Sequence, residues 1–310
     1  MRILLVSKFG DSIALAEKLR EENNDVSIYI RDNIARRLTS YSYMIDNPTV
    51  DTINSDLILV EDDNSGAFSD KARELGRPIC GGGIAADKLI RQRSFLESVV
   101  ESAKLRMAKK DTKGIPVNLG GWFVGEEFLR PYFLGIRYPR IGTGDVGKPT
   151  RGMGIVGQYR MKGHIFQVLK KLEPFLKTVK YSGYVNINLL VNNDNPLVSD
   201  IELGLTYPNV APLCELHNNI SKFLFKVATN TTKQLTAPVD KIVLGVSWLS
   251  SISELIKQPM YCKTGSSIEE AVSKVYKEMH KIDNKDVYYR VDIGVGYNTY
   301  LKELHKWELI

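Results

Sequence analysis

The chain has 310 residues, of which 43% are hydrophobic and 25% are charged, values that are ordinary for a folded globular protein. This composition excludes a disordered or fibrous chain, and the length predicts two or three domains. The formal charge of +6 and the pI of about 9.0 suit a partner that carries phosphate but do not require one.

The cysteines and apolar runs bear on the compartment. Cys80, Cys214 and Cys262 are isolated and lack metal-ligand spacing, and such an odd, scattered set predicts reduced thiols. The apolar run at residues 2–6 is too short for a secretory signal, and no run is long enough to span a membrane. We therefore expect a cytoplasmic protein without a membrane partner.

The first hundred residues alternate strand and helix patterns. An apolar run at residues 2–6 precedes the helical pattern IALAEKLREENN and the strand DVSIYI. The strand DLILVED, the helix SDKARELG and the strand RPICGG repeat this order. Such alternation predicts a parallel α/β unit, so we expect a doubly wound N-terminal domain over residues 1–104.

A single helix is predicted over about residues 85–107. It ends in the basic stretch KLRMAKKDTKG, which is either a solvated linker or a patch that contacts phosphate. The β-rich aromatic segment GGWFVGEEFLRPYFLGIRYPRI follows. We place a central α+β domain at residues 105–235.

The glycine-rich stretch GTGDVGKPTRGMG occupies residues 142–154. Glycine adopts positive φ freely and lets a ligand approach the main chain. The stretch is therefore either a flexible loop or a backbone cradle for an anion, and alone it does not decide between them.

A predicted helix over residues 164–179 leads to two strands, GYVNINLLV and LVSDIELG, joined by the turn signal NNDNP. Side chains alternate along a strand, so Asn186 and Asn188 share one face, as do Asp200 and Glu202. If the hairpin pairs these faces, the carboxylate and amide oxygens converge as a hard-oxygen set suited to Mg²⁺ with nucleotide phosphates. The alternative is a half-buried hairpin with one solvated polar face.

The remaining elements are a helix over about residues 211–228 and a last unit, for which we expect a small C-terminal α/β domain at residues 236–310. This unit runs from the strand DKIVLGVSWL through the helix SIEEAVSKVYKEMHK to the strand DVYYRVDIGVG. In that last strand Arg290 and Asp292 alternate with apolar positions, which permits an ion pair or a place beside a substrate.

Four segments, taken in order, carry a resemblance that spans most of the chain. They are GGGIAADKLIRQRSF, GEEF, GDVGKPTRGMG and YRVDIG. Together they resemble phosphoribosylamine–glycine ligase, the glycinamide ribonucleotide synthetase of purine biosynthesis and a member of the ATP-grasp superfamily. In that family the glycine-rich loop holds the sugar-phosphate substrate next to the reacting centre.

The resemblance implies an α/β fold with a doubly wound N-terminal domain, a truncated ATP-grasp-like central domain and a small C-terminal domain. It also implies a reaction in which ATP phosphorylates the carboxylate of glycine and an amine then attacks the acyl phosphate. Mg²⁺ or Mn²⁺ and ATP are the implied cofactor and co-substrate. The partners are an amino acid and an aminated sugar phosphate or nucleotide.

Residue roles follow from the resemblance. The implied metal ligands are Asp200 and Glu202, with Asn188 adding an oxygen. The implied substrate-binding residues are Gly144, Asp145, Thr150, Gly152, Met153 and Gly154. Glu126 and Glu127 are implied contacts of the nucleotide, and the implied catalytic residues are Asp145, Arg290 and Asp292.

The chain also departs from the family pattern. The interval from residue 107 to residue 120 is too short for the small subdomain that closes over the ATP phosphates. The paired glutamates of the family, where the adenosine sits, align with Gly120 and Gly121. The family's EFNxRxGDPE has become DIELGLTYPN, with loss of the arginine and of the acids of GDPE.

Two readings follow. In one, the protein is a reduced ATP-dependent carboxylate–amine ligase, and a variant of it modifies a nucleotide or a DNA base. In the other, it is a non-catalytic or regulatory relative that binds a ribonucleotide-like ligand. The chain lacks an aromatic and basic element specific for nucleic acid, which argues against a DNA partner. The sequence leaves the oligomeric state open.

Overall fold

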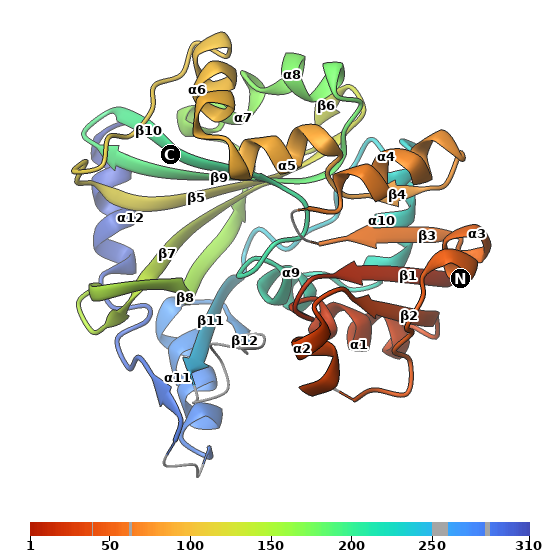
Figure 1. The fold of residues 1–310 in the computed structure, drawn as a ribbon. Coiled ribbons are helices and arrows are strands. Elements are labelled where there is room, and N and C mark those ends of the chain that lie inside the picture. Colours follow the sequence, from red (N-terminus) through yellow and green to blue (C-terminus); the bar gives the residue numbers. More distant parts are fainter. Residues whose placement is uncertain (39, 62–63, 250–259, 283–285) are drawn as a thin grey trace.

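The computed structural model describes residues 1–38, 40–61, 64–249, 260–282 and 286–310. Its strands form two sheets, one parallel and four-stranded and one nine-stranded. Figure 1 shows the smaller sheet and its helices at one side of the molecule and the larger sheet at the other. The mixed α/β fold predicted from the sequence is confirmed.

The small sheet is built from the first eighty residues. Its strand order is β2-β1-β3-β4, and the paired strands are parallel. Its elements are β1 (Arg2–Ser7), α1 (Ile13–Glu21), β2 (Asp25–Ile30), α2 (Asn33–Leu38), α3 (Thr49–Asn54), β3 (Leu57–Val60), α4 (Gly66–Glu74) and β4 (Ile79–Cys80). Because the chain leaves β1 toward β2 and later returns to β3, the carboxyl ends of β1 and β3 flank a topological switch point, where open α/β sheets bind ligands.

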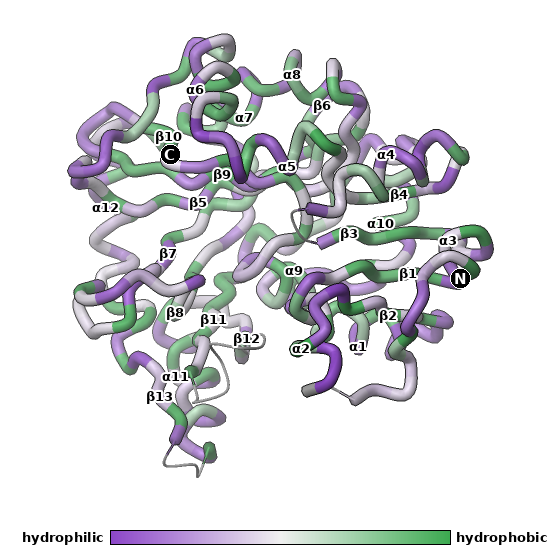
Figure 2. Tube along the Cα trace, viewed as in Figure 1, coloured by the Kyte–Doolittle hydropathy of each residue, from purple (hydrophilic) through white to green (hydrophobic). Residues whose placement is uncertain are grey.

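Apolar runs explain why β1 and β3 lie inside this sheet. Ile3, Leu4 and Leu5 are buried, and every residue of β3 is buried as well. In Figure 2 both strands are coloured as hydrophobic along most of their length. A strand that is buried on both faces loses the polar alternation of a half-exposed strand, and these two have lost it.

The large sheet is antiparallel and runs in the order β10-β9-β5-β7-β8-β11-β12, with β6 paired to β5 and β13 paired to β11. Its strands are β5 (Ile115–Val124), β6 (Glu127–Phe128), β7 (Tyr132–Gly142), β8 (Val146–Arg160), β9 (Ser182–Asn192), β10 (Asn195–Leu203), β11 (Ile242–Leu249), β12 (Met260–Gly265) and β13 (Tyr288–Tyr289). The strands after residue 236 therefore extend the central sheet, because β11 pairs with β8. The predicted domain boundary near residue 235 thus divides strands that belong to one sheet.

Helices cover the two faces of the large sheet differently. On one face, the odd-numbered residues of β5 and β9, such as Val117 and Ile187, form a hydrophobic core with the overlying helices. Leu89 and Val99 of those helices belong to this core. The helices of the remaining chain are α5 (Ile84–Arg91), α6 (Arg93–Ser102), a 3₁₀ turn (His164–Phe166), α7 (Gln167–Lys170), α8 (Glu173–Thr178), α9 (Val210–Leu216), α10 (Ile220–Ala228), α11 (Ile268–Met279) and α12 (Tyr297–Lys306). Figure 1 shows α5 to α8 gathered over this face.

The opposite face is covered at one end by α9 and α10, which also pack against the small sheet. Trp122 and Phe133 of the large sheet share one hydrophobic core with Ile3 and Leu5 of the small sheet, and Leu213 of α9 belongs to it. A buried leucine stabilises a fold by about 1.5–3 kcal/mol. The helices α9 and α10 thus hold the two sheets together.

The predicted hairpin forms from β9 and β10. Its turn lies at residues 193–194, and Asp200 pairs with Asn188 while Glu202 pairs with Asn186. A bulge between Val198 and Asp200 shifts the register once. The hairpin therefore pairs the two polar faces, which is the condition on which their convergence depends.

Three predicted helices are each interrupted. The helix predicted over residues 85–107 is two helices, because Gln92 has an extended conformation (φ −119°, ψ 96°). The helix predicted over residues 164–179 is a 3₁₀ turn and two short α-helices. The helix predicted over residues 211–228 is also two, because Asn219 is left-handed and the carboxylate of Glu22 caps a new N-terminus by accepting the N–H groups of Ile220 and Ser221 at 2.8 and 2.9 Å.

Two other predicted elements have a different form. The glycine-rich stretch is not an open loop but the end of β7, a tight turn and the first half of β8. The last predicted strand ends at Tyr289, so Arg290 and Asp292 lie beyond it. The basic stretch after α6 runs along the edge strand, where Ala108 N donates to Val198 O at 2.7 Å, and this connection covers part of the edge.

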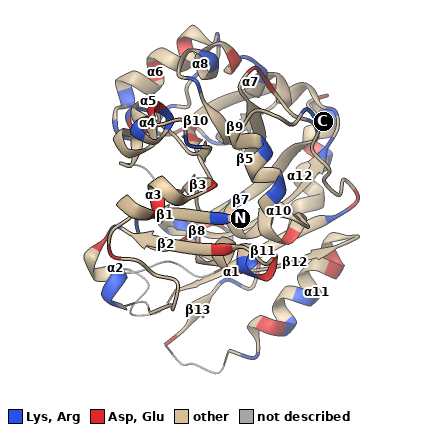
Figure 3. Cartoon of the chain, turned by 90° about the vertical axis from the view of Figure 1, so that its right-hand side faces the viewer, with Lys and Arg blue, Asp and Glu red and all other residues tan. Residues whose placement is uncertain are grey.

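Acidic and basic residues are interspersed over the face drawn in Figure 3, for example along α11. Within the part of the chain that the structure describes, no helix combines the length and the apolar character that a membrane span requires.

Candidate functional site

A polar cluster lies on the face of the large sheet that α9 and α10 cover only in part. It comprises Asn118 of β5, Arg137 of β7, Asn186 and Asn188 of β9, and Asp200 and Glu202 of β10, together with Thr206. Asn118 pairs with Asn188, and the cluster spans the four adjacent strands β7, β5, β9 and β10. Alternation along these strands places the side chains on one face.

Glu202 lies at the centre of the cluster. Its Oε2 accepts the Thr206 hydroxyl at 2.6 Å and Asn186 Nδ2 at 3.2 Å, and its Oε1 accepts Asn188 Nδ2 at 3.3 Å. Hydrogen bonds to a carboxylate are charge-assisted and stronger than neutral ones. The cluster therefore holds this carboxylate in one orientation.

Arg137 supplies the positive charge. Its Nη1 donates to Asn188 Oδ1 at 2.8 Å and lies 3.9 Å from Glu202 Oε1, while its Nη2 donates to the carbonyl of Arg151 at 3.3 Å. The side chains of Arg137 and Glu202 are each 16% exposed. Arg137 thus links the carboxylates on β10 to the glycine-rich strand β8.

Asp200 shares this environment but is held less firmly. Its Oδ1 accepts the N–H of Ile201 at 2.9 Å. Burial, followed by the negative charge of Glu202, raises the pKa of Asp200 to about 7. The carboxyl group can therefore change its protonation state near neutral pH, as groups at functional sites often do.

The donor set fits a magnesium ion that is carried mainly by phosphate. Within the described residues no three side chains of His, Cys, Asp and Glu come together as a metal cage. The oxygen of Asn188 already accepts Asn118 Nδ2 at 2.9 Å as well as Arg137. Asp200 and Glu202 remain as two carboxylates, and Mg²⁺ commonly takes one or two carboxylates, with phosphates and waters completing its shell.

The glycine-rich hairpin satisfies much of its own backbone. Thr150 donates its hydroxyl to the carbonyl of Pro139 at 3.0 Å and accepts the N–H of Gly152 at 3.0 Å. Gly152 has a φ of 133°, which side-chain-bearing residues rarely adopt. Its carbonyl accepts the Tyr207 hydroxyl at 2.9 Å, so the hairpin is tied to the loop that follows β10.

Two further residues of the predicted substrate loop face inward. Met153 is fully buried in the core with the helices. Gly154 pairs with Tyr138 and with Val246, and a Cβ there would lie 2.7 Å from Ile293 Cγ2. Close packing explains this glycine, and a role for either residue in binding substrate stays a prediction.

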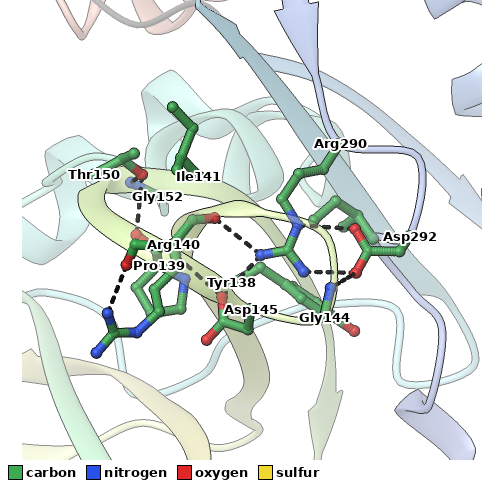
Figure 4. A network of polar contacts seen from close by, with 12 residues as sticks. Tyr138, Pro139, Arg140, Ile141, Gly144, Asp145, Thr150, Gly152, Arg290 and Asp292 are labelled. Carbon is green, nitrogen blue, oxygen red and sulfur yellow. Dashed lines mark hydrogen bonds and ion pairs between the residues drawn. The ribbon is translucent and has the colours of Figure 1, made fainter.

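Arg290 and two aspartates form a second polar network at the hairpin tip (Figure 4). Arg290 is 1% exposed; its Nε and Nη2 donate to Asp292 at 2.8 and 2.7 Å, and its Nη1 donates to Asp145 at 2.8 Å. Asp292 also accepts the N–H of Gly144 at 2.9 Å. The three residues predicted to be catalytic thus come together and fix the turn of the hairpin to the C-terminal segment.

The hairpin also contacts the carboxyl end of β1. Arg151 Nη1 donates to Asp11 Oδ1 at 3.0 Å, and the Asp11 side chain is 2% exposed. The guanidinium lies over the rings of Phe9 and Tyr207, 5.6 and 5.2 Å from their centroids. The switch point of the small sheet therefore faces the glycine-rich strand and the loop after β10.

Comparisons with known proteins add to this geometry. No protein-family model matches the sequence, and no curated protein matches it by sequence. Among solved structures, a phosphoribosylamine–glycine ligase from Thermotoga maritima aligns with 94% of this chain and 100% of its own, at a TM-score of 0.72 and 13% identity. An N5-carboxyaminoimidazole synthetase from Staphylococcus aureus aligns with 90% of this chain and 97% of its own, at a TM-score of 0.62 and 9% identity.

The chain has an ATP-grasp fold. The resemblance drawn from its sequence motifs is confirmed at this level. A pyruvate carboxylase from Rhizobium etli shares the fold over 90% of this chain and 33% of its own, at a TM-score of 0.59 and 8% identity. At such identities the likeness concerns the fold alone.

The strand β5 is closely packed at Gly120 and Gly121, the positions that the sequence resemblance aligns with the family's paired glutamates. A Cβ on Gly120 would overlap the hydroxyl of Tyr184, which is fully buried. The Trp122 ring contacts Tyr184 and Phe223, with ring centroids 5.0 and 4.9 Å apart. Aromatic side chains occupy the space beside the positions of the family's paired glutamates.

Glu126 and Glu127, the predicted nucleotide contacts, lie at the turn beyond this aromatic group. Glu126 is exposed and pairs with Lys177 at 3.0 Å. Glu127 of β6 pairs with Val124 of β5. Val124 lies four residues beyond Gly120 on that strand. The structure does not bring them to the polar cluster, and their role stays a prediction.

Sequence reasoning missed Arg137, Asn118, Thr206 and the pair Arg151–Asp11 as site residues. The available sequence signal was that Asn118 and Arg137 are polar residues between apolar residues of their strands. The pairing of β5 with both β7 and β9 is what brings them to Asn188, and no local pattern contains that pairing.

Proposed function

We propose that the protein is an ATP-dependent carboxylate–amine ligase that joins glycine or another amino acid to an aminated sugar phosphate or nucleotide. The terminal phosphoryl group of ATP passes to the carboxylate and gives an acyl phosphate and ADP. The amine then attacks the acyl carbon, and phosphate leaves with its bonding electrons as the amide forms. Mg²⁺ would neutralise charge on the phosphates.

The observation that carries this proposal is the cluster around Glu202 on the ATP-grasp sheet. Asp200 and Glu202 would hold the magnesium–phosphate group, and Arg137 would offer its guanidinium to a phosphate oxygen. Arginine suits phosphate because its planar donors match the oxygens. Phosphoryl transfer depends mainly on such positioning and charge neutralisation. The free, buried cysteines of the described structure support a reducing, cytoplasmic setting.

ADP release tests the proposal. The protein is incubated with Mg²⁺–ATP, glycine and 5-phosphoribosylamine, and then with other amino acids in place of glycine. We expect sustained ADP release, beyond one equivalent of enzyme, only when both the amino acid and the amine are present. The variant Asp200→Asn/Glu202→Gln should lose at least a hundredfold in rate, because two charges near the phosphates are removed.

The control is Asp194→Asn, which removes an exposed carboxylate at the turn of the same hairpin. It should keep the parent rate. No ADP release by the parent with any amino acid, or equal rates in parent and double variant, would exclude the ligase.

A second candidate function is a non-catalytic relative that binds a ribonucleotide-like ligand. The packing of Trp122 and Tyr184 beside Gly120 favours it, because an adenine ring would have to displace buried aromatics. Calorimetric titration of the parent with each ligand separates the two candidates: this one predicts that ribose 5-phosphate binds more tightly than Mg²⁺–ATP.

A further inference from the structure

Two adjoining cavities lie at the end of the large sheet where β7 begins and β8 ends. Their volumes are about 540 and 460 Å³, and both are lined by Arg130, Tyr132 and Lys170. We call them together the basic trough. It lies at the end of β7 opposite to the hairpin tip at residues 142–146, and Figure 1 shows β6 beside α7 and α8 in this region.

The smaller cavity is unusually cationic. Its lining includes four basic side chains, those of Arg130, Arg160, Lys162 and Lys170. Among its described lining residues, Glu308 has the carboxylate side chain. The larger cavity adds Lys233 to Arg130 and Lys170, with Glu127 and Glu173 on its wall. Positive charge is thus concentrated in the smaller cavity.

The cations of the smaller cavity form no close ion pair within the described structure, although Glu308 lies on the same wall. Arg130, Arg160, Lys162 and Lys170 take part in none of its ion pairs. Surface lysines elsewhere do have partners, such as Lys71 with Glu74 at 3.0 Å. Like charges gathered in a concave site raise the local concentration of anions.

We infer that the basic trough binds a small ligand that carries two or more phosphate groups. Arg130 and Arg160 suit bidentate contact with phosphate, and the two lysines act as point charges. The volume of the smaller cavity lies within the range of small-molecule sites. Tyr132 and Phe166, with ring centroids 4.9 Å apart, give it an apolar wall.

This site is separate from the one assigned above. Tyr132 and Phe166 belong to the core beneath α5 to α8, whereas Glu202 and Arg137 lie on the opposite face of the sheet. The inference therefore does not rest on the proposed ligase function. It assigns a binding site with no metal and no catalytic group.

Calorimetric titration with inorganic tripolyphosphate in the presence of EDTA tests it, because chelation removes any contribution of a magnesium site. We expect the parent to bind, and Arg130→Gln/Lys162→Gln to weaken binding at least tenfold. Both side chains are exposed, so the fold should persist, which the melting temperature checks. Lys170→Gln should also weaken binding.

The matched control is Lys109→Gln/Lys110→Gln, which removes the same net charge at exposed positions outside the trough. It should bind tripolyphosphate within twofold of the parent. Absence of binding by the parent, or an equal loss in the lysine control, would show that the trough is no site. An unchanged affinity of the trough variant would show the same.

Discussion

His217 is a single buried residue that makes the stability of the fold depend on pH. Its side chain is 3% exposed, its Nε2 lies 2.8 Å from the Tyr159 hydroxyl, and its ring stacks on Phe223. Burial lowers the pKa of His217 to about 4, below the usual value of 6.5. The imidazole is therefore neutral in the folded protein at pH 7.

The sign of the pH effect follows. Below about pH 6.5 the unfolded chain binds a proton at His217 that the folded chain does not take up until about pH 4. Stability is thus full above pH 6.5 and falls as the pH drops toward 4, by at most about 3 kcal/mol. Urea denaturation of the parent and of His217→Gln across this range checks it; the variant should show a flatter profile, and parallel profiles would contradict the assignment.

At the scale of elements, the hairpin β9–β10 shows what sequence could predict. Its period-two pattern predicts the shared face of Asp200 and Glu202, and its turn signal predicts where the two strands join. The register, which includes a bulge between Val198 and Asp200, comes from the structure. The breaks at Gln92 and Asn219 could not be predicted in this way. The first depends on backbone conformation in a polar stretch, and the second on Glu22, which is distant in sequence and caps α10.

The candidate site was predictable only in part for the same reason. Its carboxylates lie within one hairpin, so local periodicity finds them. Arg137 and Asn118 reach the cluster through pairings across the sheet. Asp145, Arg290 and Asp292 were expected beside substrate, and in the structure they bond to one another and to the hairpin turn.

The strand β5 offers a test of the packed aromatic group. Gly120→Ala places a methyl group against the Tyr184 hydroxyl and should destabilise the fold by about 1–3 kcal/mol. That hydroxyl is buried without a hydrogen-bond partner among the described residues, so Tyr184→Phe alone should change stability by less than about 1 kcal/mol.

The two substitutions should be coupled. In the Tyr184→Phe background the cost of Gly120→Ala should be smaller, because part of the overlap is removed. Denaturant midpoints of the parent, both single variants and the double variant measure this coupling. Strict additivity would mean that the two side chains do not compete for the same space.

On the scale of the whole molecule, the carboxyl ends of β1 and β3 meet the polar face of the large sheet. Gly204, just after β10, approaches the carbonyls of Val60 and Glu61, and Arg151 reaches Asp11 after β1. The switch point of one sheet and the carboxylates of the other thus border the same region. The proposed ligase function places its phosphate site in this region.

The most direct test of the magnesium–phosphate site is calorimetric titration of Mg²⁺–ADP into the parent and into Asp200→Asn/Glu202→Gln. We expect the parent to bind in the presence of Mg²⁺ and more weakly when Mg²⁺ is chelated. The double variant should bind at least tenfold more weakly than the parent and lose the dependence on Mg²⁺, while Asp194→Asn binds like the parent. Equal affinity and equal Mg²⁺ dependence in parent and double variant would contradict the assignment of Asp200 and Glu202.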